Sequence, residues 1–215
     1  MAETYLYEIH FLGFDLTNWL VLDIGAFVGD TALYYARRGA FVVAVEPLPT
    51  NYEIMLKNLE LNSSLKHKVI PINAAIGSQD AFVELSYNDP VDGAASIYSA
   101  GRFRTKVRSM KLSTLIKEIS SMGIDLKQFR VKVLKMDCKG CEYDVINETN
   151  ALRLFDIINI EYSGYLRNKT YHELKNTLEN LGFVCRIWAH NEGVLRIGLD
   201  RHGIMTCIKS HEVIR

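Results

Sequence analysis

The sequence predicts an α/β fold in which helices cover both faces of a mostly parallel, Rossmann-like sheet. Two observations lead to this prediction. Continuous apolar runs, which are typical of strands buried on both faces, alternate with segments of helical periodicity almost throughout the chain. A chain of 215 residues, 48% of them apolar, can also bury such a sheet within one domain. We therefore expect residues 1–215 to form a single doubly wound domain.

Seven strands are expected, one for each apolar run. Alternation of strands with helices requires crossover connections, which make the strands parallel. The last two runs have no helical pattern between them, so we expect an antiparallel pair at one edge of the sheet. The runs are residues 20–24, 41–46, 68–73, 131–137, 156–162, 183–189 and 204–210.

Between these strands, three helices and one insertion are expected. Thr50 and Glu53 have the spacing of a capping box, as do Thr170 and Glu173, so a helix should begin at each site. Apolar residues at helical spacing mark a third helix from Leu112 to Met122. The segment 80–111 holds two further β-like stretches and a turn. We predict a small β insertion there, which could bind the substrate because such insertions often shape substrate pockets.

The charge balance and the cysteines restrict partners and location. Lys and Arg number 25, as do Asp and Glu, and this zero net charge counts against nucleic acid as the main partner. No apolar run approaches the ~20 residues of a membrane span, and no signal peptide is visible. We expect no disulfide framework from the four cysteines, so a reduced, cytoplasmic setting is the default.

An apolar strand that runs into a glycine-bearing turn is the most informative feature. A dinucleotide fingerprint needs small residues at the positions of Phe27 and Asp30, because a pyrophosphate must lie on the helix N-terminus. The aromatic ring would block a pyrophosphate, and the carboxylate would repel it. The pattern from Asp23 through Gly25 to Gly29 resembles instead the first motif of class I S-adenosylmethionine (SAM) methyltransferases, whose cofactor carries no phosphate.

Three polar residues at the ends of the first three strands are candidates for cofactor binding. Glu46 is expected to accept hydrogen bonds from both ribose hydroxyls, although a strand-end acid can also serve as a cap. Asp23 either holds the turn through backbone amides or faces the amine and sulfonium of SAM. Asn73 either offers its amide to an adenine edge or makes a turn.

Later motifs extend the likeness to one family. The sequence resembles the FkbM-type SAM-dependent methyltransferases over roughly residues 20–185. The motifs that carry this resemblance, in the family's order and spacing, are Asp23 to Asp30, Glu46-Pro47, Asn73 to Gly77, Asp137-x-x-Gly140-x-Glu142 and Ile160-Glu161. The resemblance implies a class I fold, SAM as the methyl donor, and methylation of a hydroxyl on a small molecule or sugar.

The resemblance also assigns residues to two groups. The cofactor side comprises Asp23, Gly25, Phe27, Gly29, Glu46, Asn73 and Asp137. The acids around the reacting centre are Asp137, Glu142 and Glu161, and any of them could be the general base or orient the acceptor. They could instead hold a divalent metal such as magnesium, because hard oxygen ligands suit it. We favour the version without metal and assign no metal ligand.

Lys139 stands where the family commonly has an acid. It could orient an anionic acceptor, but we expect it to point to solvent. The motif Cys138-x-x-Cys141 lacks the second cysteine pair of a zinc site. It also lacks the downstream proline of a thioredoxin-like pair, because no proline follows Pro90. We therefore expect two small residues that pack under a tight glycine turn.

Four cations alternate along one expected strand and so share one face, namely Arg102, Arg104, Lys106 and Arg108. They either protect an edge strand from aggregation, which we favour, or form a surface for an anionic acceptor or a nucleic-acid backbone.

Two alternative functions stay open. One is an N-methyltransferase acting on RNA or protein, but such enzymes often carry Asn/Asp-Pro-Pro-aromatic where this chain has residues 137–140. The other is a SAM-binding domain without turnover, for which Lys139 is the only hint.

Overall fold

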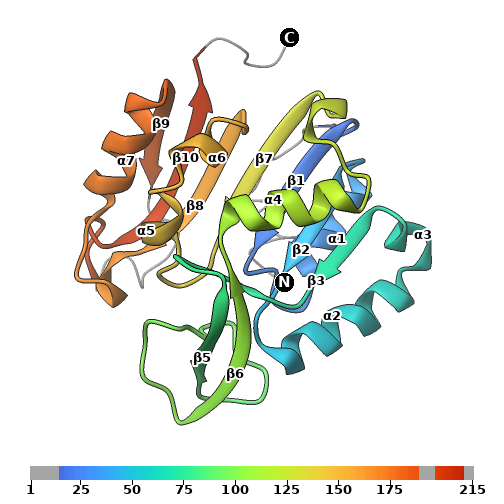
Figure 1. The fold of residues 1–215 in the computed structure, drawn as a ribbon, viewed down its shortest axis with the longest axis horizontal. Coiled ribbons are helices and arrows are strands. Elements are labelled where there is room, and N and C mark those ends of the chain that lie inside the picture. The colour runs from blue at the N-terminus through green and yellow to red at the C-terminus, as the bar shows by residue number, and fades with distance from the viewer. Residues whose placement is uncertain (1–14, 189–196, 211–215) are drawn as a thin grey trace.

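The computed structural model describes residues 15–188 and 197–210. A seven-stranded sheet lies at its centre (Figure 1). From one edge to the other the strands are β3 (Val69–Ile72), β2 (Phe41–Val45), β1 (Trp19–Ile24), β7 (Val131–Met136), β8 (Ile157–Ser163), β10 (His202–Lys209) and β9 (Phe183–Trp188). The predicted fold class and the seven predicted strands are confirmed. Residue 189, the expected end of one strand, lies outside the described residues.

The strand directions also follow the prediction. Strands β3, β2, β1, β7 and β8 are parallel to their neighbours. Strand β10 is antiparallel to both β8 and β9, so β9 and β10 are the expected antiparallel pair. Strand β9 forms the outer edge, and β10 lies one place inward from it.

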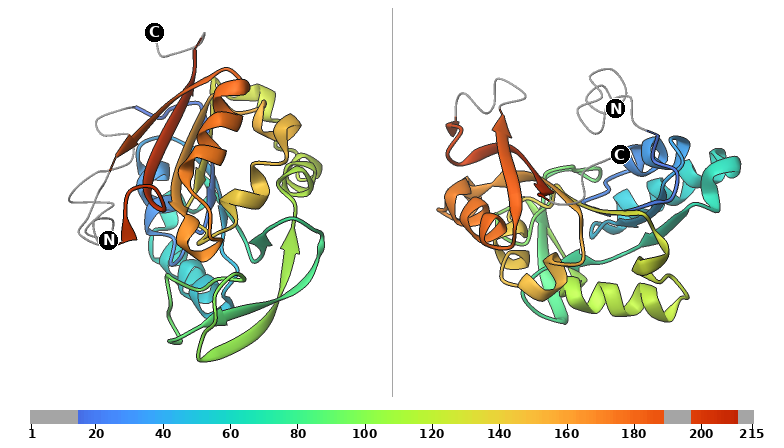
Figure 2. Two further views of the ribbon diagram at one scale, coloured as in Figure 1. Left: turned by 90° about the vertical axis from the view of Figure 1, so that its left-hand side faces the viewer. Right: turned by 90° about the horizontal axis from the view of Figure 1, so that it is seen from above.

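Helices cover both faces of this sheet (Figure 2). Successive residues of a strand point to opposite faces, so Leu20 and Leu22 belong to one core and Trp19 and Val21 to the other. The first core includes residues of α4 (Leu112–Ser121), α5 (Glu142–Val145), α6 (Thr149–Leu152) and α7 (Tyr171–Asn180). The second includes residues of α1 (Asp30–Arg37), α2 (Pro49–Leu61) and α3 (Ser63–Lys66). Within the described residues, 3-10 helices span Leu126–Gln128 and Gly164–Leu166. Among the described helices, none is long and apolar enough to cross a membrane.

Neither predicted capping box forms its side-chain hydrogen bond. Helix α7 does begin after Thr170, but the Thr170 side chain makes no capping bond. Helix α2 begins two residues earlier than predicted, because Pro49 occupies the first helical position. Thr50 therefore lies inside the first turn, and its hydroxyl donates a hydrogen bond to the carbonyl of Pro90.

The predicted insertion is a second, three-stranded sheet in the order β4 (Ala75–Ile76), β6 (Phe103–Met110), β5 (Ala81–Tyr87). Strands β5 and β6 pair antiparallel along their whole length. They project from the main sheet at the end where its parallel strands finish (Figure 1).

The expectation that the cysteines form no disulfides is wrong. Cys138 is bonded to Cys141, and Cys185 to Cys207. The second pair arises because the register of β9 and β10 places the two residues directly opposite each other, with their Cα atoms 4.1 Å apart. This pairing depends on strand register, which the linear spacing of cysteines does not reveal.

Candidate active site

A cleft of about 460 Å³ lies between the carboxyl ends of the parallel strands and the insertion. The turns after β1, β2 and β7 line it, as do residues 92–98 of the insertion. In α/β folds, this end of the sheet is where small ligands bind. The predicted site residues that line the cleft are Gly25, Phe27, Glu46, Asp137 and Glu161. Those outside its lining are Asp23, Gly29, Asn73 and Glu142.

The turn after β1 brings backbone to the cleft. Gly25 has a φ of 80°, and a Cβ there would lie 2.0 Å from the carbonyl oxygen of Asp137. No side chain fits at this position, so glycine allows the turns after β1 and β7 to meet. At Gly29, also with positive φ, a Cβ would lie 2.8 Å from Cγ of Met55. The second glycine therefore serves helix packing, and only the first faces the cleft.

Glu46 both holds the neighbouring turns and faces the cleft. One carboxylate oxygen accepts a hydrogen bond from the amide of Phe27 at 3.0 Å. The other accepts from the amide of Leu48 at 3.0 Å and from Nδ2 of Asn51 at 3.1 Å. Burial raises the pKa of Glu46 to about 7, although these hydrogen bonds oppose the shift. The two roles expected for Glu46, cap and cofactor ligand, are therefore compatible.

Asp23 lies behind the cleft and is fully buried. Its carboxylate accepts a hydrogen bond from the hydroxyl of Thr31 at 2.6 Å and forms an ion pair with Nζ of Lys135 at 2.9 Å. Lys135 lines the cleft and also donates to the carbonyl of Gly25 at 3.3 Å. Asp23 thus supports the turn, as one of its two expected roles required, but through the side chains of Thr31 and Lys135. It does not line the cleft.

Asn73 uses its amide on the neighbouring turn. Its Nδ2 donates to the carbonyl oxygens of Glu46 at 2.8 Å and Pro47 at 3.2 Å. This contact fixes the end of β2, where Glu46 sits. The arrangement matches the alternative that Asn73 makes a turn, and it leaves the adenine contact without support.

Lys139 joins two of the predicted acids. Its Nζ lies 2.6 Å from Oδ1 of Asp137 and 3.0 Å from Oε1 of Glu161. Only 16% of the Lys139 side chain is exposed, so the expectation that it points to solvent is wrong. Burial lowers the pKa of Lys139, but the two carboxylates outweigh this effect and raise it well above its ordinary value. Lys139 is therefore a cation, and all three side chains line the cleft.

Glu142 is separated from these groups and fully buried. Its carboxylate accepts hydrogen bonds from the backbone amides of Gly140 and Ser163. Burial raises the pKa of Glu142 to about 7. Because it ties the turn after β7 to the end of β8, its place is structural, which corrects its grouping with the acids at the reacting centre.

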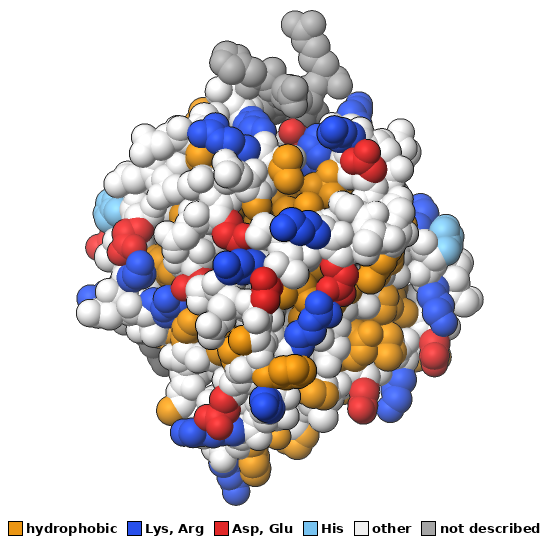
Figure 3. Space-filling model, in the orientation of Figure 1, with side chains coloured by type: hydrophobic (Ala, Val, Ile, Leu, Met, Phe, Trp, Pro, Cys, Tyr) orange, Lys and Arg blue, Asp and Glu red, His pale blue; other side chains and the backbone are white. Residues whose placement is uncertain are grey.

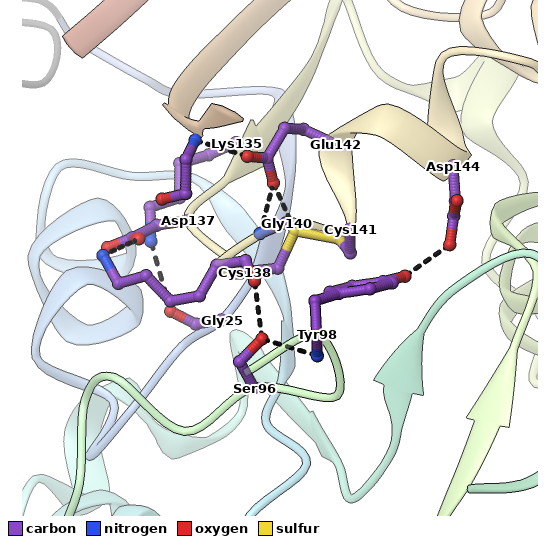
Figure 4. The surroundings of a disulfide bond; sticks show 12 residues. Gly25, Ser96, Tyr98, Lys135, Asp137, Cys138, Gly140, Cys141, Glu142 and Asp144 are labelled. Carbon is purple, nitrogen blue, oxygen red and sulfur yellow. Dashed lines mark hydrogen bonds and ion pairs between the residues drawn. A yellow bond between two sulfur atoms is a disulfide. The ribbon is translucent and has the colours of Figure 1, made fainter. Parts of the chain in front are cut away.

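The turn that carries Lys139 is held from several sides (Figure 4). The disulfide between Cys138 and Cys141 closes the turn. The hydroxyl of Ser96 donates to the carbonyl of Lys139 at 2.7 Å and accepts from the amide of Tyr98 at 3.0 Å. The insertion thus contacts the turn directly, and both line the cleft.

One group of potential metal ligands occurs among the described residues, namely Cys138, Cys141 and Glu142. The two sulfur atoms are bonded to each other, so neither is a thiolate that could bind a metal. The carboxylate of Glu142 already accepts backbone hydrogen bonds. In this oxidised form the group is not equipped to hold an ion.

The residues of the cleft that were not named individually from the sequence include Lys135, Ser96 and Tyr98. A charged residue at position 135, next to a buried apolar run, is a signal that could have indicated a buried ion pair. Ser96 and Tyr98 lie in a loop of the insertion and carry no comparable pattern.

Of the four alternating cations, Arg102 lies just before β6 and the other three lie within it, and two of the four are paired with acids. Arg104 lies 2.8 Å from Glu84, and Arg108 also contacts Glu118. Positive and negative side chains are interspersed on the face shown in Figure 3. Such pairing weakens a positive field, which counts against a surface for an anionic acceptor. The expected edge strand is wrong, because β6 lies between β4 and β5, although β4 pairs only with its last two residues.

Comparison with known proteins points to one family. A family model described as Methyltransferase FkbM domain matches residues 23–185. Methyltransferase 1 of Beauveria bassiana is 23% identical over 188 residues, which cover 78% of this chain and 73% of that protein. Methyltransferase sdnD of Sordaria araneosa is 22% identical over 193 residues, covering 78% and 74%.

Solved structures show the same fold. Methyltransferase FkbM from Methylobacillus flagellatus superposes with a TM-score of 0.63 at 15% identity, over 96% of this chain and 47% of that one. The present chain therefore spans about half of that solved chain. Magnesium protoporphyrin IX methyltransferase from Synechocystis, solved with bound SAM, gives a TM-score of 0.52 at 11% identity, covering 91% and 72%.

Proposed function

Because the chain belongs to the FkbM methyltransferase family, we propose that it transfers a methyl group from SAM to a hydroxyl of a small molecule or sugar. One observation carries this proposal. The cleft combines the backbone turn at Gly25 and the carboxylate of Glu46 with a pair of acids, Asp137 and Glu161. A cofactor side and a reacting side thus share one cavity.

The residues present fit SAM better than a dinucleotide. Phe27 and Asp30 line the cleft, where a ring and a carboxylate oppose a pyrophosphate. Glu46 lines the same cleft, which supports the proposal that its carboxylate accepts ribose hydroxyls. Asp137, Glu161 and Lys139 leave one net negative charge, which suits a cationic ligand.

Methyl transfer needs alignment of the acceptor and removal of its proton. SAM supplies an activated methyl group when it is bound. Asp137 and Glu161 come from the end of β7 and from β8, and both line the cleft. Either carboxylate is placed to orient an acceptor hydroxyl or to take its proton as the new carbon–oxygen bond forms. Residues 92–98 of the insertion line the same cleft, so we propose that they contact the acceptor.

Several observations bear on partners and location. Balanced, interspersed charges support a small-molecule or glycan acceptor over nucleic acid. The expected cytoplasmic setting rested on the absence of disulfides, and the two pairs remove that support.

A labelling experiment tests the proposal. The protein is incubated with methyl-deuterated SAM and a panel of hydroxyl-bearing sugars and small molecules, and mass spectrometry follows the label. We expect a deuterated methyl ether together with S-adenosylhomocysteine. A deuterated methyl group found on nitrogen would show that the acceptor group is an amine and not a hydroxyl. SAM binding without transfer to any member of a broad panel would favour the non-catalytic domain.

A further inference from the structure

The position of Lys139 has a consequence for how the two acids work. Its ammonium lies between a carboxylate oxygen of Asp137 and one of Glu161, at 2.6 and 3.0 Å. The exposed fractions of the two acids are 29% and 16%. Two partly buried carboxylates that face one point repel each other unless a cation lies between them. Hard oxygen ligands of this kind are the usual ligands of Mg²⁺ and Mn²⁺.

The backbone holds the ammonium at this point. Lys139 has a positive φ of 51° and is followed by Gly140 with a φ of 114°. The carbonyl of Lys139 accepts a hydrogen bond from the hydroxyl of Ser96, and the flanking disulfide closes the turn. Lysine rarely adopts a left-handed conformation, so the turn keeps it there at a conformational cost.

The neighbouring lysine makes its direct contact elsewhere. Lys135 forms its ion pair with Asp23 at 2.9 Å, on the buried side of the cleft. Asp137 and Glu161 also help to raise the pKa of Lys135, but through attraction over a longer range than an ion pair. Lys139 is the cation that bridges the pair lining the cleft.

We propose that Lys139 is a positioning residue that acts as a built-in cation, holding Asp137 and Glu161 together in place of a divalent metal ion. The inference rests on the proposed methyl transfer for its catalytic meaning. If Lys139 supplies the cation, methyl transfer needs no added metal ion. The same two carboxylates become a metal site once the ammonium is removed.

The decisive test is Mn²⁺ binding, followed by electron paramagnetic resonance and calorimetry. Lys139→Asn removes the charge, and asparagine tolerates positive φ. We expect saturable binding of one Mn²⁺ by this variant and none by the wild type. Lys139→Arg keeps a cation and should not bind Mn²⁺. Adding Glu161→Gln to Lys139→Asn should abolish the binding.

Lys132 provides a matched control. It forms a partly buried ion pair with Asp156 at 2.8 Å, at the opposite end of β7. Lys132→Asn should bind no Mn²⁺, which separates a specific site from the loss of any lysine. If Lys139→Asn does not fold, Lys139→Gly is used, because glycine adopts positive φ readily and adds no metal ligand.

Activity provides the second arm. Wild-type turnover should be unchanged in excess EDTA, and Lys139→Asn should lose at least tenfold in kcat and recover with Mg²⁺. Saturable Mn²⁺ binding by the wild type at these carboxylates, or loss of its turnover in EDTA, would overturn the inference. So would a folded Lys139→Asn that binds no Mn²⁺. Failure of the wild type to bind SAM would instead refute the proposed function, and the Mn²⁺ measurements do not depend on it.

Discussion

At the scale of single residues, Glu46 has two tasks, because it fixes the turns around it and faces the cleft. Glu46→Gln keeps the shape but removes the charge. We expect SAM binding to weaken by about 1.5–3 kcal/mol, the range for hydrogen bonds to a charged group. Calorimetry measures this loss. Glu53→Gln, exposed on α2, is the control and should bind SAM normally. An unchanged dissociation constant for Glu46→Gln would remove the residue from the cofactor site.

Asp137 and Glu161 carry the catalytic prediction. Glu161→Gln or Asp137→Asn should lower turnover by roughly 10²-fold or more if the carboxylate takes part in proton transfer. SAM affinity should change less, at least for Glu161. Glu173→Gln serves as a control, because this exposed acid also pairs with a lysine, Lys169, but outside the cleft. Full activity in both cleft variants would make these acids structural.

Most of the predicted site residues that line the cleft were expected at the ends of strands. Gly25, Glu46, Asp137 and Glu161 all reach the cleft for this reason. The partner of Asp23 could not be predicted in this way. Asp23 meets Lys135 through the register of β1 and β7, which joins positions far apart in the chain.

Lys139 was misplaced for a different reason. Its direction depends on a left-handed backbone conformation in a turn. A sequence motif gives the residue at a position, but it does not give the backbone conformation of the turn, which sets the direction of the side chain. Glu142 was misassigned similarly, because backbone amides of Gly140 and Ser163 hold its carboxylate away from the cleft.

At the scale of elements, apolar runs predicted the strands well because each buried strand needs a continuous apolar segment. The path of the loop from residue 88 to 102 was not predictable. It depends on contacts such as Asn51 with the carbonyl of Asp92 at 2.9 Å. Such contacts join a helix to a distant loop, and no sequence pattern links the two residues.

The two disulfides give a prediction at this scale. The pair Cys185–Cys207 has a sequence separation of 22, against 3 for Cys138–Cys141. A longer closed loop restricts the unfolded chain more, so replacing Cys185 and Cys207 by Ala should lower the free energy of unfolding by about 3 kcal/mol. Replacing the other pair should cost less. Chemical denaturation of both double variants measures the difference, and the reverse order would contradict the argument from loop length.

At the scale of the whole molecule, burial of Glu46 and Glu142 links stability to pH. The pKa of each is raised from 4.5 to about 7 in the folded protein. The folded state therefore binds more protons than the unfolded state between these values, so their contribution is full below about pH 4.5 and is lost as pH rises through about 7.

A variant isolates this effect. Glu46→Gln does not titrate, so its stability relative to the wild type should rise by about 1–3 kcal/mol between pH 5 and pH 8. Urea denaturation across this range checks the change, and Glu53→Gln should show no such trend. A difference between Glu46→Gln and wild type that is constant with pH would mean that Glu46 titrates at its ordinary value.

The central claim is that the cleft between the glycine turn, Glu46 and the acid pair binds SAM. Calorimetry with the purified protein tests it most directly, with SAM, S-adenosylhomocysteine and NAD titrated in parallel. We predict saturable binding of SAM and S-adenosylhomocysteine and none of NAD, because Phe27 and Asp30 oppose a pyrophosphate. Binding of NAD together with no binding of SAM would contradict the account.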